Sequence, residues 1–216
     1  DTKVVNITIE EKPTGEISAG AGVGTSGGSV GFSLQENNYM GQGISLRSSL
    51  NLDNSSIQGV VAVTVPNYNY SDNSLVASVR SSTEDYLTDY GYKTGKTGFS
   101  VGTRFEQYED FYFSPKISAY YEKLTTQSNA SANLKKQEGT YQDIFVDYSI
   151  SLDKRDQAYQ PSDGYQSSFS QKLPLYSQNY ALTNGYVLTS YHQLVQEMVG
   201  SFSLYTKMIT SLSDED

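Results

Sequence analysis

The stretch Asp143-Ile-Phe-Val-Asp-Tyr-Ser-Ile-Ser-Leu152 decides the fold, because an apolar residue stands at every second position. A period of two is that of a β-strand, in which successive side chains point to opposite faces of the sheet. One face of this strand carries Ile144, Val146, Tyr148, Ile150 and Leu152, and the other carries Asp147, Ser149 and Ser151. A sheet that is apolar on one side and polar on the other, over many long strands, indicates a transmembrane β-barrel with a polar lumen.

The same alternation recurs along the whole chain and predicts further strands. The expected ranges are 16–24, 29–39, 43–52, 57–66, 74–83, 98–107, 111–124, 142–153, 164–175, 181–194 and 199–211. We therefore expect an all-β fold in which about eleven antiparallel strands form a meander, as part of a transmembrane barrel.

Charged residues predict which face of these strands meets water. Arg47, Arg104 and Lys207 each fall on the polar side of an expected strand. A cation placed against lipid costs free energy, so the face that carries it is expected to line the lumen. We therefore predict that Arg47, Arg104, Asp147 and Lys207 are lumen-facing.

The composition agrees with a membrane protein built from strands. Only 37% of the residues are hydrophobic, and the mean hydropathy is -0.50. No apolar run approaches the roughly 20 residues of a membrane helix, but a barrel strand needs only about 9–11 alternating residues. The 19 Tyr and 8 Phe are typical of the aromatic girdles at membrane interfaces. A Tyr-rich soluble β-sandwich is the alternative on composition alone.

Cysteine usage and charge exclude several classes of function. The chain has no Cys, which fits an exported bacterial protein without disulfides and excludes zinc–thiolate sites. The net charge of -9 argues against nucleic acid as a partner, since nucleic-acid binding calls for a basic face.

The expected connections differ in length at the two ends of the sheet. Residues 84–97 and 125–141 are predicted to be long polar loops at one end, and 38–43 and 154–163 are predicted to lie at the opposite end. Barrels of this class carry longer loops outside the cell than on the periplasmic side. The length of 154–163 departs from that rule.

Three features resemble chemical motifs, but their context argues against catalysis or cofactor binding. Gly22–Gly27 matches G-x-G-x-x-G, and Gly91–Thr97 resembles a phosphate loop with one residue too few, yet neither is followed by an expected helix. His192 is the only histidine and is expected to be a lumen or interface side chain. We predict no enzymatic activity, no cofactor and no metal site.

Four phrases of the sequence occur in the same order in one known family. They are Glu11-Lys-Pro-Thr-Gly15 before a Gly-rich strand, Asn38-Tyr-Met-Gly-Gln-Gly43, Val65-Pro-Asn-Tyr68, and Asp153-Lys-Arg155 through Pro161-Ser-Asp-Gly164. They resemble the linker after the last periplasmic POTRA domain, the ends of strands two and four, and the turn before strand nine of the BamA family of outer-membrane protein assembly factors.

The resemblance implies a domain organisation and a location. Residues 1–15 would be the last strand of a POTRA-like domain with its linker, and residues 16–216 the N-terminal part of a barrel in the bacterial outer membrane. By the family's sixteen-strand pattern, we expect this chain to be a fragment. The partners implied are the lipid bilayer, unfolded client outer-membrane proteins, and periplasmic or lipoprotein accessory subunits.

The resemblance also implies a function for the first strand. Members of the family insert client barrels through a weak lateral seam, where the first strand can accept an incoming strand by β-augmentation. The expected gate residues are Ile17, Ser18, Ala19, Gly20, Ala21, Gly22, Val23 and Gly24. Glycines contribute no cross-strand side-chain contact and cost more entropy to order, which would weaken such a seam.

Several alternatives remain open at this stage. The small residues of the first strand could instead permit close packing or a bend. The barrel could export a polypeptide rather than insert client proteins, or it could be a passive porin or adhesin.

Overall fold

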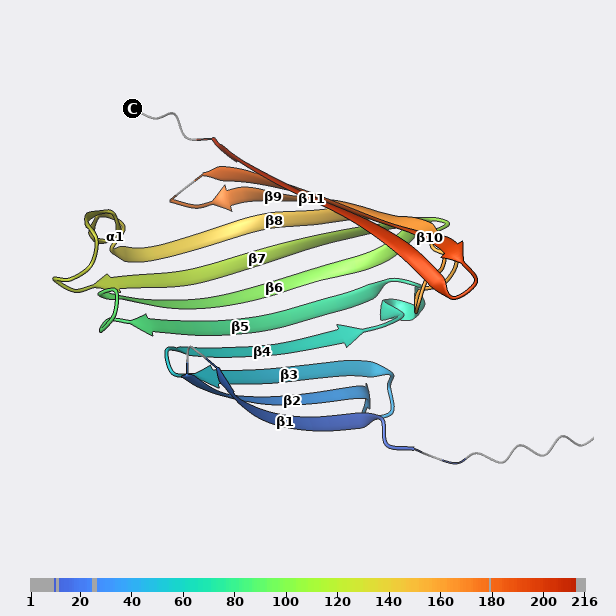
Figure 1. Ribbon diagram of the computed structural model, residues 1–216, viewed down its shortest axis with the longest axis horizontal. Coiled ribbons are helices and arrows are strands. Elements are labelled where there is room, and N and C mark those ends of the chain that lie inside the picture. The colour runs from blue at the N-terminus through green and yellow to red at the C-terminus, as the bar shows by residue number, and fades with distance from the viewer. Residues whose placement is uncertain (1–9, 11, 25–26, 179, 213–216) are drawn as a thin grey trace, which may run out of the picture.

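The protein is a single antiparallel sheet with its strands in sequence order (Figure 1). The computed structural model describes residues 10, 12–24, 27–178 and 180–212. The strands are β1 (Gly15–Gly24), β2 (Gly27–Tyr39), β3 (Ile44–Asp53), β4 (Ser56–Val65), β5 (Ser74–Tyr86), β6 (Tyr92–Tyr108), β7 (Phe111–Thr126), β8 (Gly139–Asp153), β9 (Gly164–Tyr176), β10 (Ala181–Val195) and β11 (Met198–Ser211). Two short helices, η1 (Tyr68–Tyr70) and α1 (Ala132–Lys136), lie in connections. The predicted all-β meander of eleven strands is confirmed.

The prediction of a long loop at residues 84–97 is wrong. Strand β5 continues to Tyr86 and β6 begins at Tyr92, so the connection is only residues 87–91. The strand ends here are polar on both faces, and Lys93 pairs with Asp85 at 2.7 Å. The alternation of apolar and polar residues therefore disappears here, although the backbone pairing of β5 with β6 continues to Tyr86 and Tyr92. The same correction applies to the motif at 91–97, of which only Gly91 lies in the connection.

The long connection between β7 and β8 is confirmed, but it contains a helix that the sequence did not predict. Helix α1 has 5 residues, and the hydroxyl of Ser131 caps it by accepting from the backbone N–H of Leu134. A helix this short has too few residues to display a 3.6-residue period.

The register of the strands defines two faces, because directly paired residues of an antiparallel sheet point to the same side. One row pairs Arg80 with Gly98, Gly98 with Tyr120, and Tyr120 with Asp143. We call the side that carries this row the inner face. The adjacent row pairs Val79 with Phe99, Phe99 with Ala119, and Ala119 with Ile144, and defines the outer face.

Apolar side chains are exposed on the outer face rather than gathered in a core. Among the described residues, Leu124 and Ala130 are the buried hydrophobic ones. Large apolar side chains of the outer face remain open, with Val61 47%, Phe99 52% and Ile117 52% exposed. Water would penalise such a surface, whereas a lipid bilayer would cover it.

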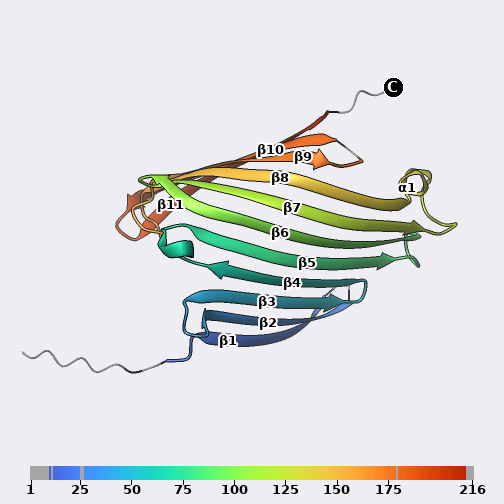
Figure 2. The same ribbon diagram turned by 180° about the vertical axis from the view of Figure 1, so that it is seen from behind.

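The sheet curls toward its inner face. Side chains from strands that are not neighbours, Gln58 on β4 and Lys172 on β9, line a common hollow on that side. The reverse view shows the same curved wall of side-by-side strands, with β1 at one edge and β10 and β11 at the other (Figure 2). The described strands thus form a curved barrel wall that is not closed.

The connections fall at two ends, as expected. Residues 87–91 and 127–138 share one end, where Gln127 donates its backbone N–H to Gly91 O at 2.8 Å. Residues 40–43 and 154–163 lie at the other end. Residues 1–9, which hold the expected POTRA-like strand, lie outside the described residues. The proposed boundary at residue 15 therefore stays a prediction.

Candidate functional site: the first strand and the inner face

Strand β1 is the most exposed strand of the sheet. All ten of its residues are exposed, and it pairs along its full length with β2. In the part of the chain that the structure describes, its second edge has no strand partner. The predicted gate residues 17–24 all lie on β1.

The glycines of β1 do not serve close packing. A Cβ added at Gly20 or Gly24 would meet nothing within 4 Å, and one at Gly22 would reach only ordinary contact with Ser29 Oγ at 3.5 Å. None of the three has a positive φ angle. Within the described residues, the surroundings therefore do not require glycine at these positions.

Side-chain contacts that hold β1 to β2 decrease along the strand. At its start, Thr14 donates its hydroxyl to the carboxylate of Glu36, and Asn37 donates its backbone N–H to Thr14 O at 3.2 Å. Further along, Gly20 faces Gly31 and provides no side-chain contact. The C-terminal half of β1 therefore depends mainly on backbone hydrogen bonds, each contributing about 0.5–1.5 kcal/mol net.

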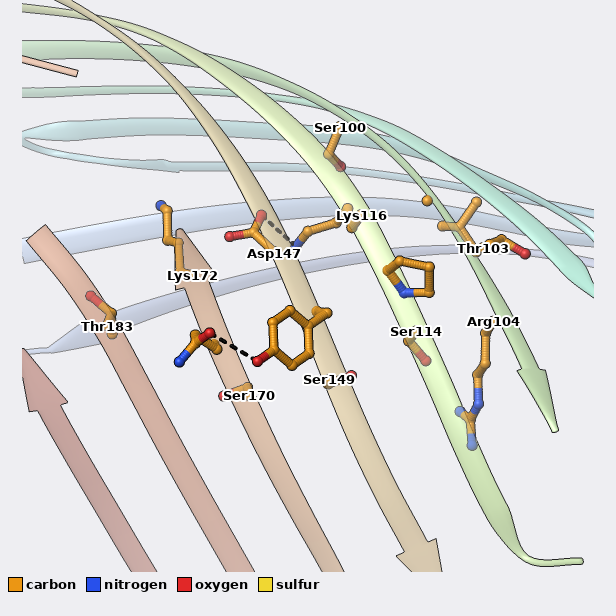
Figure 3. Close-up of a pocket in the computed structure, with 15 residues that line it drawn as sticks. Ser100, Thr103, Arg104, Ser114, Lys116, Asp147, Ser149, Ser170, Lys172 and Thr183 are labelled. Carbon is orange, nitrogen blue, oxygen red and sulfur yellow. Dashed lines mark hydrogen bonds and ion pairs between the residues drawn. The ribbon is translucent and has the colours of Figure 1, made fainter. Parts of the chain in front are cut away.

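The structure places Arg47, Arg104, Asp147 and Lys207 on the inner face, as their register with neighbouring strands requires. They do not form one cluster. Arg104 and Asp147 line the same hollow of about 440 Å³ (Figure 3), whereas Arg47 on β3 and Lys207 on β11 stand apart from it.

Asp147 is the centre of the polar contacts in this hollow. Its carboxylate lies 3.6 Å from Lys116 Nζ (Figure 3). It also accepts a hydrogen bond from Ser118 Oγ at 2.5 Å. Lys116 was missed in the sequence analysis, although it lies between Ser114 and Ser118 on the polar side of its strand, which is the same signal that indicated Arg104. Arg104 lies over the ring of Tyr112, at 4.5 Å from the ring centroid, in a cation–π contact.

A second group on the inner face surrounds Tyr120. Its ring lies against Gly98, where an added Cβ would come within 2.5 Å of the ring. Lys96 and Lys172 lie 5.2 and 4.8 Å from the ring centroid, and Lys96 also pairs with Glu122 at 2.5 Å. The register brings these residues together, so single-strand periodicity could not have indicated the group.

The turn at 154–163 is held by a dense set of polar contacts. Arg155 binds both oxygens of Asp153, at 2.7 and 2.6 Å, and Lys154 pairs with Asp110 at 2.8 Å. Gly164 has a φ of 94°, and a Cβ there would lie 2.1 Å from Lys154 O, so only glycine fits. Hydrogen bonds from Ser162 lower the pKa of Asp156. The phrase Asp153–Gly164 therefore encodes a rigid turn.

His192 lies at the same end of the sheet as this turn and not in the lumen. Its Nδ1 is 3.3 Å from Asp163 Oδ1, and its side chain is 80% exposed. It pairs with Gly200 and lies on the outer face, so of the two expected positions, lumen or interface, the register agrees with the interface. Within the described ranges, no group of three or more His, Cys, Asp or Glu side chains could hold a metal ion. No described helix is long and apolar enough to cross a membrane.

The exposed apolar outer face, the polar inner face and the curved meander define a transmembrane β-barrel protein. A family model, the Omp85 superfamily domain, matches residues 14–216. The chain belongs to the Omp85 superfamily, and it is a protein of the bacterial outer membrane.

Comparison with solved structures agrees on the fold. The chain is similar to the crystal structure of BamA from Haemophilus ducreyi lacking POTRA domains 1–3, with a TM-score of 0.71 and 21% sequence identity. The match covers 92% of this chain and 42% of that chain, so the chain spans less than half the length of the solved BamA. A search of curated proteins finds no match.

Proposed function

We propose that this chain is part of a barrel that inserts client β-barrel proteins into the outer membrane, with β1 as the strand that receives them. The observation that carries the proposal is the state of β1. In its pairing with β2, Gly20 faces Gly31, and within the described residues Gly20 and Gly24 have no contact that would require glycine. A strand held mainly by backbone hydrogen bonds can exchange partners at low cost, which suits β-augmentation.

The proposed partners follow from this function. The outer face contacts lipid, client strands approach the edge of β1 that faces away from β2, and accessory subunits bind outside the described residues. Insertion of client barrels requires no covalent chemistry, so we propose that the protein is not an enzyme. Arg47, Arg104, Asp147 and Lys207 would line a water-filled lumen, where their charges remain hydrated.

A disulfide across the seam tests this function. Cysteine replaces Ala19 and, in the complete protein, the residue facing it on the last barrel strand. The native chain has no Cys to interfere. Oxidation should block client insertion in reconstituted membranes, and reduction should restore it. A control pair joining Ala19 to its β2 neighbour Phe32 locks a seam that need not open, and should leave insertion unchanged.

The same variants distinguish insertion from polypeptide export. A barrel that exports through its lumen should keep working with the seam locked, because the path does not cross the wall. Full client insertion by the oxidised, demonstrably crosslinked protein would exclude β1 as the gate.

A further inference from the structure

Three polar side chains form a hydrogen-bonded row on the outer face. Tyr148 on β8 pairs with Gln171 on β9, which pairs with Asn184 on β10. The Tyr148 hydroxyl donates to Gln171 Oε1 at 2.8 Å, and Gln171 Nε2 donates to Asn184 Oδ1 at 2.7 Å. We call Tyr148, Gln171 and Asn184 the amide row.

The amide row lies within the apolar band and not at its rim. On β9, the outer-face neighbours of Gln171 are Phe169 and Leu173. On β8, the outer-face neighbours of Tyr148 are Val146 and Ile150, near the middle of the stretch from Ile144 to Leu152. By contrast, the outer face of β4 carries only Ile, Val and Gly, at Ile57, Gly59, Val61, Val63 and Val65.

The row is incompletely satisfied. A carboxamide has two N–H donors and an oxygen that accepts two hydrogen bonds. The amide nitrogen of Asn184 has no hydrogen-bond acceptor within the described part of the chain, although its oxygen accepts from Gln171. Lipid chains offer no acceptor, so both N–H groups of Asn184 would remain unpaired in hydrocarbon, which costs free energy.

A second polar pair extends this surface. Ser167 donates its hydroxyl to the Tyr186 hydroxyl at 3.1 Å, again between the outer faces of β9 and β10. The two hydrogen-bonded groups thus lie next to each other on β8 to β10. Side-chain amides and hydroxyls in this setting are the groups that hold transmembrane segments together.

We infer that the amide row is a contact between two copies of this protein in the membrane. Carboxamides carry donors and acceptors together, so a row that meets its own twofold-related copy can satisfy the free N–H groups of Asn184 with carboxamide oxygens of the other copy. The contact does not involve β1, which lies at the opposite edge of the described sheet. The inference is therefore independent of the proposed function, and both copies would keep their seams free.

Single-cysteine crosslinking in native membranes tests the contact, using the complete protein. Met208 faces Asn184 on β11 and is 60% exposed, whereas Val61 on β4 is 47% exposed and remote from the row. Each is replaced by Cys, and a short bis-maleimide is added to outer membranes. M208C should give homodimers and V61C at least several-fold fewer.

Removing the amide should abolish the difference. Asn184→Leu combined with M208C should reduce the dimer to the level of V61C, while the heat-modifiable gel mobility shows that the barrel is folded. Because Asn184→Leu could alter folding, Gln171→Leu is tested in the same background and should also weaken the dimer. Equal crosslinking of M208C and V61C, crosslinking of M208C only to a different protein, or unchanged dimer in a folded Asn184→Leu variant would each overturn the inference.

Discussion

Replacing Val146 with Arg should destabilise the membrane-inserted barrel far more than the same replacement three residues away. Val146 lies on the outer face, between Ile117 on β7 and Leu173 on β9. An Arg near the membrane midplane of a barrel costs about 2–4 kcal/mol. That loss corresponds to a decrease of roughly 30-fold or more in the folding equilibrium constant.

Ser149→Arg is the matched control on the same strand. Ser149 faces Ser114 and Ser170 on the inner face and lines the hollow of about 440 Å³, where an added guanidinium can remain hydrated. Its cost should stay within about 0.5 kcal/mol, as for substitutions at exposed sites.

Urea titration of the complete protein in lipid vesicles measures both changes. The chain has no Trp, so the folded fraction is followed by heat-modifiable gel mobility. The midpoint should fall clearly for Val146→Arg and little for Ser149→Arg. If Ser149→Arg were the more damaging change, the assignment of the outer face to lipid would be refuted.

Four further outcomes are expected. Gly98→Val should destabilise the barrel by about 1–3 kcal/mol, because its side chain would displace the ring of Tyr120; equal stability in the same urea titration would contradict this. The lowered pKa of Asp156 means that its carboxylate stabilises the turn above the ordinary pKa of 3.8, and that this contribution is lost as the pH falls through the lowered value. Amide protection in the turn should decrease over that acid range, and Asp156→Asn should remove the pH dependence. Protease added to intact cells should cut within residues 127–138 and spare 154–163, whereas the reverse pattern would invert the topology. His192→Ala should still support client assembly, and loss of assembly by a folded variant would reopen a catalytic role.

The sequence alone was sufficient to predict the number and order of the strands and the apolar face of each, but not all of their ends. Alternation is local, since each residue's side is fixed by its neighbours along the same strand. Ile144 through Leu152 therefore indicated the apolar face correctly, and Arg47, Arg104, Asp147 and Lys207 all lie on the opposite one. The Gly-rich composition of β1 was also evident from the sequence.

The tertiary structure alone decided which side chains meet across strands. Lys96, Tyr120 and Lys172 come from three strands, and only the register brings both ammonium groups to one ring. The register likewise joins Gln171 to Asn184. It also extends β5 and β6 through residues whose two faces are both polar, where local periodicity carries no signal. The physical reason is that lateral neighbours are set by hydrogen-bond pairing between distant segments, and a shift of a single residue would place every side chain on the other face.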